Sequence, residues 1–203
     1  MTMTKGRLIV FSAPSGCGKG TMIKEILKDE NYFLSVSDTT RAPRTEDIPG
    51  VTYNFLTREQ FESLIRENGY LEYAEYCGNY YGSPVKPIEE RLAAGKDVIL
   101  EIEVQGAMKI KAKRPDALMI FVLPPSVAEL RRRLNKRGTE AQDVIDRRVA
   151  AAADEIAHAH EYDYVIVNDA LEVAIADFKA IIKAEKHKAE YAAEIIDEVI
   201  KNA

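Results

Sequence analysis

Residues 7–28 read Arg-Leu-Ile-Val-Phe-Ser-Ala-Pro-Ser-Gly-Cys-Gly-Lys-Gly-Thr-Met-Ile-Lys-Glu-Ile-Leu-Lys. The run from Arg7 to Ser12 is apolar and rich in β-forming residues, and it ends in a cluster of proline and glycines. From Thr21 to Lys28 the apolar residues recur at helical spacing. The segment therefore predicts a strand, a glycine loop and a helix, in that order.

The loop between this strand and helix has most of the features of a phosphate-binding loop, usually written Gly-x-x-x-x-Gly-Lys-Ser/Thr. Glycines let backbone N–H groups converge on phosphate oxygens, while the lysine reaches the β- and γ-phosphates. Ala13 replaces the first glycine and Gly20 takes the Ser/Thr position. We expect nine residues to bind a nucleoside triphosphate: Ala13, Pro14, Ser15, Gly16, Cys17, Gly18, Lys19, Gly20 and Thr21.

The glycine at position 20 changes the expectation for magnesium. A hydroxyl directly after Lys19 is the usual Mg²⁺ ligand, and Gly20 has none. Mg²⁺ would then be held by phosphate oxygens of the nucleotide, by waters, by Thr21 or by a carboxylate elsewhere in the chain.

Three further apolar runs predict buried strands: Val98–Ile102, Leu118–Leu123 and Tyr164–Val167. Helical segments separate them, and such alternation indicates a parallel sheet covered by helices on both faces. Signals for helix ends occur as capping boxes at Thr57 with Gln60 and Ser126 with Glu129, and as terminal glycines at Gly69 and Gly95. An amphipathic stripe runs from Leu171 to Ile182, and the charged residues after it predict that the last helix breaks or projects beyond the core.

Composition limits the class of protein. The 203 residues are 46% hydrophobic, which favours one compact domain with smaller insertions. No apolar run approaches the roughly 18 residues of a membrane span. The start has no signal-peptide region, so we expect a cytoplasmic protein without membrane contact. The net charge of -5 argues against binding to nucleic acid.

The two cysteines, Cys17 and Cys77, are too few for a disulfide framework and are expected to be reduced thiols. A phosphate-facing backbone and the nearby Lys19 could lower the pKa of Cys17. We do not expect a catalytic thiol, because no histidine is near it in the sequence.

Two segments depart from the alternating pattern, residues 35–83 and the arginine-dense residues 131–148. In the first, Arg41 and Arg44 stand three apart in an irregular stretch and could converge on one phosphate monoester, although solvated surface arginines fit the pattern as well. Glu72 could accept hydrogen bonds from the N1–H and N2–H₂ edge of guanine. Ordinary packing of a small sheet is the alternative for the tyrosine-rich strand-like pieces around it.

Six motifs in one order resemble the guanylate kinase family from about residue 8 to residue 169. They are Ala-Pro-Ser-Gly-x-Gly-Lys-Gly-Thr at 13–21, Ser-Asp-Thr-Thr-Arg-x-Pro-Arg at 37–44, Tyr-Asn-Phe at 53–55, Gly-Asn-Tyr-Tyr-Gly-Ser at 78–83, Glu-Ile-Glu-Val-Gln-Gly at 101–106 and Arg-Gly-Thr-Glu at 137–140. Several separate motifs in order are far more specific than a phosphate loop alone.

The resemblance implies an α/β fold with a P-loop NTPase three-layer core around a parallel sheet. The core would comprise residues 1–36, 84–125 and 159–203, with a small mixed β/α GMP-binding insertion at 37–83 and a helical lid at 126–158. It also implies transfer of phosphate from MgATP to GMP, and to dGMP, with ATP and GMP as the partners and no protein partner predicted.

The resemblance further implies roles for individual residues. The GMP phosphate would bind Arg41, Arg44, Tyr53 and Tyr81, and guanine would bind Ser37, Glu72, Ser83 and Glu103. Glu101 and Glu103 stand where the family often has Asp, and Glu101 and Thr21 would lie near the metal. ATP would contact Arg133 and Arg137 besides the loop, and the transition state would contact Lys19, Arg41, Arg137 and Arg148.

Two alternatives stay open from the sequence. One is a kinase for another nucleoside monophosphate: AMP, UMP or dTMP. The other is a guanylate-kinase-like module that has lost catalysis and binds a protein.

Overall fold

The structure, a computed structural model, describes residues 5–136, 141–189 and 192–201. Its centre is a five-stranded sheet in the order β2-β7-β1-β8-β9, with every neighbouring pair parallel. The strands are β1 (Leu8–Ser12), β2 (Tyr32–Leu34), β7 (Asp97–Glu101), β8 (Leu118–Leu123) and β9 (Tyr164–Val167). The predicted α/β fold with a parallel sheet is confirmed, but the short edge strand β2 was not expected. The prediction that Tyr164–Val167 is buried was wrong in part, because β9 lies at the edge of the sheet and its Val165 and Val167 are exposed.

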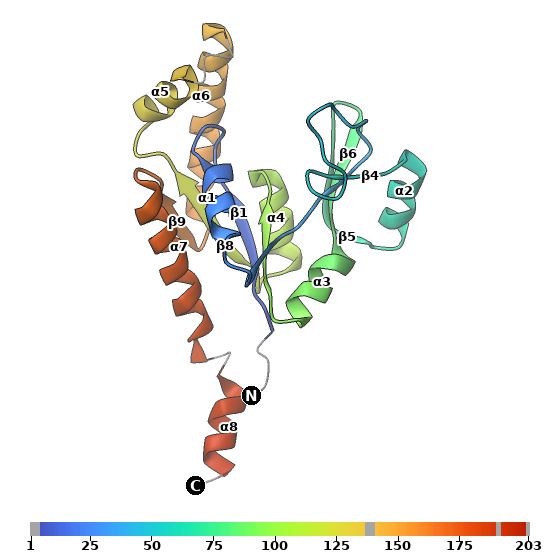
Figure 1. Cartoon of the computed structure of the whole chain (residues 1–203), viewed down its shortest axis with the longest axis vertical. Coiled ribbons are helices and arrows are strands. Elements are labelled where there is room, and N and C mark those ends of the chain that lie inside the picture. The colour runs from blue at the N-terminus through green and yellow to red at the C-terminus, as the bar shows by residue number, and fades with distance from the viewer. Residues whose placement is uncertain (1–4, 137–140, 190–191, 202–203) are drawn as a thin grey trace.

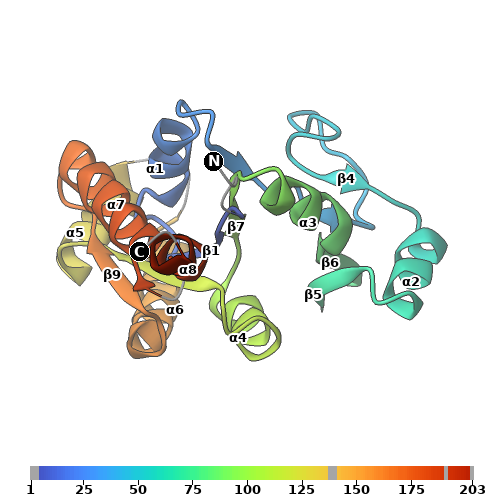
Figure 2. The same ribbon diagram turned by 90° about the horizontal axis from the view of Figure 1, so that it is seen from below.

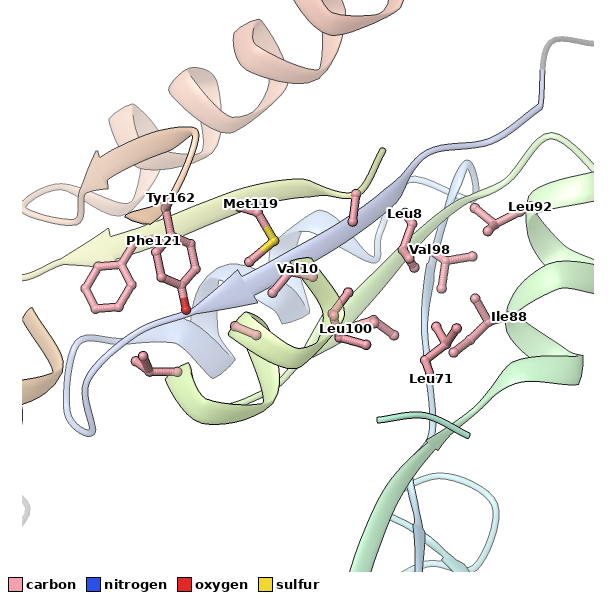
Figure 3. Close-up of a cluster of buried hydrophobic side chains, with 14 of the residues drawn as sticks. Leu8, Val10, Leu71, Ile88, Leu92, Val98, Leu100, Met119, Phe121 and Tyr162 are labelled. Atoms are coloured by element: carbon pink, nitrogen blue, oxygen red, sulfur yellow. The ribbon is translucent and has the colours of Figure 1, made fainter. Parts of the chain in front are cut away.

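Helices cover both faces of this sheet because its three central strands, β7, β1 and β8, are apolar on both sides. Alternate residues point to opposite faces. Ile9 and Phe11 pack with α1 (Lys19–Ile26) and α7 (Leu171–Lys186), while Leu8 and Val10 pack in the cluster that includes residues of α3 (Val85–Ala93) and α4 (Val104–Lys113). Figure 3 shows this second cluster, in which Val10 lies between Leu100 and Met119 of the two neighbouring strands. The central strand β1 therefore carries core residues on each face and holds the loop that follows it firmly.

A second, four-stranded sheet lies to one side of the first, together with α2 (Arg58–Arg66) (Figures 1 and 2). Its order is β4-β3-β6-β5, with β3 (Asp38–Thr39), β4 (Asn54–Phe55), β5 (Tyr70–Tyr76) and β6 (Asn79–Pro84). β3 is parallel to β4 and antiparallel to β6. Leu71 of β5 reaches into the core cluster beside Ile88, so the two sheets share buried apolar surface.

The hairpin between β5 and β6 turns one residue earlier than predicted. The prediction placed the turn at Gly78-Asn79, but Asn79 already pairs with Tyr76 in the ladder. Cys77 and Gly78 have φ of 49° and 75°. Two central residues with positive φ are typical of the type I′ turns that suit a two-residue hairpin.

Helix ends follow the sequence signals in part. At the start of α2, Thr57 and Gln60 form the complete capping box. At the start of α5 (Val127–Lys136), Ser126 accepts the Glu129 N–H at 3.0 Å, but the Glu129 carboxylate turns to arginines of its own helix instead of closing the box.

The two predicted terminal glycines behave differently. Gly95 has φ of 76° after α3, as expected for a helix-ending glycine. After α2 the left-handed residue is Asn68, with φ of 54°, and Gly69 is the residue beyond it, whose N–H donates to Leu64. Asn tolerates this conformation better than most residues, and the prediction of Gly69 at that position was wrong by one residue.

Helices α5 and α6 (Gln142–Ala157) pack against each other. They and the second sheet lie on opposite sides of the central sheet (Figure 1). Leu130 and Leu134 of α5 and Ile145 and Val149 of α6 form a separate cluster that also buries Cys17 of the glycine loop. The short helix η1 (His158–Glu161) then leads into β9. Helices α5 and α6 therefore contact the glycine loop directly.

The last described helix, α8 (Ala193–Lys201), projects away from the body of the molecule (Figure 1). This confirms the predicted break after α7, which ends at Lys186. Within residues 5–136, 141–189 and 192–201, no helix combines the length and apolar composition needed to cross a membrane.

A buried ion-pair network joins the end of α7 to the start of the sheet. The Glu185 side chain is 1% exposed and lies 2.9 Å from Arg7 Nη2 and 2.8 Å from Lys188 Nζ. Tyr164 donates to the same carboxylate at 2.7 Å. Although burial opposes its charge, the bonds from Lys188 and Tyr164 and the charge of Arg7 hold the pKa of Glu185 below its ordinary value.

Candidate active site

The glycine loop spans the gap between β1, which ends at Ser12, and α1, which begins at Lys19. Gly16 and Gly18 have φ of 95° and 82°, in the left-handed region that favours glycine. The helix begins two residues before the predicted start at Thr21, so Lys19 and Gly20 lie in its first turn. The loop therefore presents backbone N–H groups and a positive helix end to one point, which suits an anion.

A buried side chain that was not predicted supports the loop from below. Asn168 follows β9 and is 6% exposed, and its Nδ2 donates to the Cys17 carbonyl at 2.7 Å. The backbone carbonyl of Asn168 accepts a hydrogen bond of 2.9 Å from Arg133 Nη1. The sequence does contain a signal for this position: the polar pair Asn168-Asp169 directly follows a predicted parallel strand. Since the carboxyl ends of parallel strands lie at one edge of the sheet, these residues are expected near the glycine loop.

Cys17 is not activated. It is fully buried, and burial raises its pKa to about 12, while the charges of Arg133 and Lys19 lower it only in part. The suggestion that the loop could lower this pKa is wrong, since the cluster under α5 excludes water from the thiol. Cys77 is exposed at the hairpin turn.

A cavity of about 530 Å³ opens in front of the loop. Besides loop residues, three carboxylates line it: Glu101, Glu103 and Glu155. Glu101 Oε1 lies 3.6 Å from Lys19 Nζ. Glu155 of α6 was not predicted; burial and the charge of Glu103 raise its pKa. A single glutamate on a helical surface gives no sequence signal of this position.

The residues at the cavity fit magnesium that arrives with a nucleotide. Thr21 and Glu101, the two predicted ligands, line the same cavity and offer hard oxygen atoms. Across the described part of the chain, no group of three or more His, Cys, Asp or Glu side chains is placed to hold a metal by itself. Mg²⁺ commonly takes one or two carboxylates plus substrate phosphates and waters, which matches this donor set.

The second sheet has two distinct faces, and the strand register decides which residues share one. Directly opposite residues share a face, and the pairs are Asp38 with Gly82 and Thr39 with Tyr81. Ser83 pairs with Glu72, whereas its neighbour Pro84 pairs with Tyr70. Thus Glu72, Tyr81 and Ser83 lie on one face, and by strand alternation Ser37 and Tyr53 join them.

A β-bulge at Leu71 makes this arrangement possible. Without it, Tyr70 and Glu72 would share a face, because they are two residues apart. The register shift between them sends Tyr70 to the side of α2, where it stacks on Phe61 at 4.3 Å, and Glu72 to the opposite face. Bulges are a common means of re-aiming a side chain beside a site.

The Glu72 carboxylate is buried, and Ser83 Oγ donates to it at 2.9 Å. Burial raises the pKa of Glu72, against the opposing effect of Ser83 and of lysine charges. A Cβ added at Gly106 would stand 3.3 Å from Glu72 Oε2, so the first turn of α4 closes over the carboxylate. Glu103 is the N-cap residue of α4 and also lines the cavity at the glycine loop. It therefore lies between the two predicted nucleotide sites.

The structure brings together three of the four residues predicted for the acceptor phosphate. The Arg41 guanidinium carbon lies 5.4 Å from the Tyr53 ring centroid, and the rings of Tyr53 and Tyr81 are 5.8 Å apart. Arg41 Nη1 also lies 2.9 Å from Asp47 Oδ2. The fourth residue, Arg44, is exposed beside them on the same loop.

The arginines of the second insertion divide into two kinds. Arg148 of α6 donates to Ser15 in the glycine loop, and Arg133 is held by Glu129 and the Asn168 carbonyl. Arg131 pairs with Asp146 of α6, and Arg132 pairs with Glu129 of its own helix, α5. Arg137, Gly138, Thr139 and Glu140 lie outside the described residues.

Comparison with known proteins assigns the chain to a family. The sequence profile described as "Guanylate kinase" matches residues 5–185. A guanylate kinase of Thermus thermophilus is 50% identical over 184 residues, covering 91% of this chain and 84% of that protein. One from Halalkalibacterium halodurans is 50% identical over 191 residues, covering 94% of each. The crystal structure of guanylate kinase from Anaplasma phagocytophilum superposes with a TM-score of 0.72 at 38% identity, covering 93% of this chain and 90% of that one. The chain belongs to the guanylate kinase family.

Proposed function

We infer that the protein is a guanylate kinase, which transfers the γ-phosphoryl group of MgATP to GMP and dGMP and forms ADP with GDP or dGDP. The observation that carries this conclusion is the shared face of the second sheet. It combines a buried carboxylate, Glu72, with the cluster of Arg41, Tyr53 and Tyr81. A carboxylate complements the donor edge of guanine, and an arginine with two phenols complements a phosphate monoester.

On this proposal the donor half is the glycine loop. Backbone N–H groups of residues 13–21 other than Pro14, which has none, and the ammonium of Lys19 hold the triphosphate. Arg133 of α5, Arg148 of α6 and Arg137 of the segment between these helices also contact it. Arg148 already contacts Ser15 of the loop. The insertion from 126 to 158 acts as the lid that excludes water from the transfer.

The acceptor half is the insertion from 37 to 83, joined to the core segments 1–36, 84–125 and 159–203. Ser37, Glu72, Ser83 and Glu103 orient guanine, and Arg41, Arg44, Tyr53 and Tyr81 hold its phosphate. The acceptor is already a phosphate oxyanion near neutral pH, so no covalent intermediate is needed. Positioning and neutralisation of charge by Lys19, Arg41, Arg137 and Arg148 supply the rate.

Magnesium would arrive with ATP and, when bound, would supply positive charge to the phosphates. Glu101, at the end of β7, and Thr21 line the cavity and would hold the ion, Glu101 through water and Thr21 through the hydroxyl that Gly20 does not have. Because ATP and GMP are the substrates, we propose a cytoplasmic location.

The alternatives have no specific support. The relatives that match over most of the chain are guanylate kinases rather than kinases of another monophosphate. A non-catalytic module would be expected to lose the loop lysine or the acceptor arginine, yet both are present. Lys19 lines the cavity in front of the glycine loop, and Arg41 lies against the ring of Tyr53.

The test is a coupled assay of ADP release with AMP, GMP, dGMP, UMP and dTMP as acceptors, for the wild type and Lys19→Met. We expect activity with GMP and dGMP only, and its loss in the variant without a change in thermal unfolding. Lys24→Met on the exposed side of α1 is the matched control and should keep full activity. Near-normal turnover of Lys19→Met would contradict the mechanism, and a preference for another monophosphate would contradict the assignment.

A further inference from the structure

Asp47 lies between the two arginines assigned to the acceptor phosphate. Its Oδ2 is 2.9 Å from Arg41 Nη1 and accepts a hydrogen bond of 2.7 Å from the backbone N–H of Arg44. Solvent reaches only 14% of the Arg41 side chain and 7% of the Asp47 side chain. One carboxylate oxygen therefore joins the guanidinium of the first arginine to the backbone of the second.

A tight turn fixes this carboxylate. The Asp47 N–H donates to the Arg44 carbonyl at 3.1 Å, and the side chain returns to the Arg44 N–H. The hydrogen bond from Arg41 is the main reason that the pKa of Asp47 lies below its ordinary value, so the group is ionised at neutral pH. The turn therefore fixes the position of the carboxylate that contacts Arg41.

The polar contacts of Arg41 all involve one nitrogen of its guanidinium, Nη1. Asp47 and the Ala42 carbonyl both contact Nη1, and the cation lies against the rings of Tyr53 and Phe55 at 5.4 and 5.7 Å. Within the ranges that the structure describes, Nη2 and Nε have no hydrogen-bond partner. A guanidinium has five N–H donors, so the edge formed by Nη2 and Nε remains available for a bidentate contact with phosphate.

We propose that Asp47 is a positioning residue for the acceptor phosphate: it holds Arg41 by Nη1 so that the Nη2 and Nε edge faces the phosphate of GMP, and it fixes the backbone that carries Arg44. This rests on the assignment of the GMP phosphate to Arg41 and Arg44. Asp47 itself does not contact the substrate, because its negative charge would repel a phosphate.

Because of this repulsion, two possible roles of Asp47 predict opposite changes in GMP affinity. If Asp47 acted only through its electric field, neutralising it would strengthen GMP binding. If it positions Arg41 and Arg44, its removal weakens binding, since a free guanidinium must be ordered each time GMP binds. The two effects have opposite signs.

The experiment compares equilibrium binding of GMP and guanosine, without ATP, to the full-length protein. Guanosine offers the same base without the phosphate, so the ratio of the two dissociation constants reports on phosphate contacts alone. The variants are Asp47→Ala, Asp47→Asn and Glu46→Gln. Glu46 is the exposed neighbour on the same loop and loses the same charge without touching Arg41.

We expect Asp47→Ala to raise the Kd for GMP about tenfold, as for loss of a charge-assisted hydrogen bond, and to leave the Kd for guanosine within about twofold. Asp47→Asn should have a smaller effect, because its amide oxygen still accepts the Arg44 N–H. Glu46→Gln should change neither constant. In kinetics, the KM for GMP should rise in Asp47→Ala while the KM for ATP stays constant.

Three results would overturn the proposal: tighter GMP binding by Asp47→Ala, an equal loss for GMP and guanosine, or the same effect from Glu46→Gln. Arg41→Met tests the underlying assignment separately. If that variant keeps the wild-type preference for GMP over guanosine, the phosphate does not bind at Arg41. The assignment then fails, whatever Asp47 does, while ADP release with GMP still tests the kinase activity independently.

Discussion

The glycine at position 18 permits a precise prediction, because its backbone and its surroundings each oppose a side chain. Its φ is 82°, and a Cβ added there would stand 2.7 Å from Asn168 Nδ2. That nitrogen donates to the Cys17 carbonyl in a buried position and cannot move without losing the bond. Gly18→Ala should therefore destabilise the folded protein and disturb the loop at once.

The magnitude follows from the two contributions. A residue with a Cβ in the left-handed region costs about 1–2 kcal/mol, and displacing the Asn168 amide leaves a buried carbonyl unsatisfied at about 1–3 kcal/mol. We expect Gly18→Ala to lower the free energy of unfolding by about 2–5 kcal/mol. That is a large part of the stability of an ordinary domain.

Gly20→Ala is the matched control in the same loop. Gly20 lies in the first turn of α1, and a Cβ there meets nothing within 4 Å. This variant should be as stable as the wild type or more stable by about 0.5–1 kcal/mol, because Ala favours helix over Gly. Denaturant unfolding and ATP titration of both variants measure the contrast.

A double-mutant cycle tests the mechanism behind the number. Asn168→Ala alone should cost about 1–3 kcal/mol through the lost bond. Combined with Gly18→Ala, it removes the group that the new Cβ would strike, so the double variant should be less destabilised than the two single changes predict together. Strict additivity, or a loss in Gly20→Ala equal to that in Gly18→Ala, would refute the reasoning.

Glu72→Gln should weaken GMP binding about tenfold or more, because the amide presents a donor where guanine needs an acceptor. The pKa of Glu72 is raised, so lowering the pH through it should reduce the GMP affinity of the wild type more than that of the variant. Titrations of the Kd against pH for both proteins measure this difference. Glu185 has a lowered pKa in the fold, so its contribution is present above the ordinary carboxylate pKa and is lost as pH falls through the folded one. Glu185→Gln should therefore be less stable by about 2–4 kcal/mol at pH 7, with the difference shrinking in acid unfolding curves; a constant difference would contradict this. Tyr70→Phe leaves one oxygen of the buried Asp38 unpaired and should cost about 1–3 kcal/mol with a raised KM for GMP, whereas Tyr76→Phe on the exposed end of the same strand should do neither.

The architecture was predictable wherever a run of residues had a clear period. The apolar strands after residues 7, 97 and 117 are buried on both faces, and burial on both faces leaves an unbroken apolar run in the sequence. β3 and β4 have two residues each, too few to show any period. Their place in a sheet depends on partners far away in the chain, such as β6.

The candidate site was predictable where one residue type does the chemistry, as with Lys19 and Arg41, and where ordered motifs could be compared. It was not predictable where a role depends on a distant neighbour. Asn168 supports Cys17 across 151 residues, and the inert state of Cys17 depends on a helix that covers the loop. Local sequence shows Lys19 near Cys17, but it cannot show that water is excluded from the thiol.

The bulge at Leu71 makes chain length a functional property of β5. Three successive residues there go to three places: Tyr70 to the α2 side, Leu71 into the shared core and Glu72 to the opposite face, which we propose binds guanine. A substitution at one of these positions changes the contacts of one side chain, but a deletion or insertion of one residue would send all three side chains to the wrong face. At the exposed tip, Cys77 and Gly78 carry no such assignment. In a screen of single-residue insertions and deletions along this hairpin, tolerance should therefore be confined to the tip, and GMP kinase activity should vanish at the bulge.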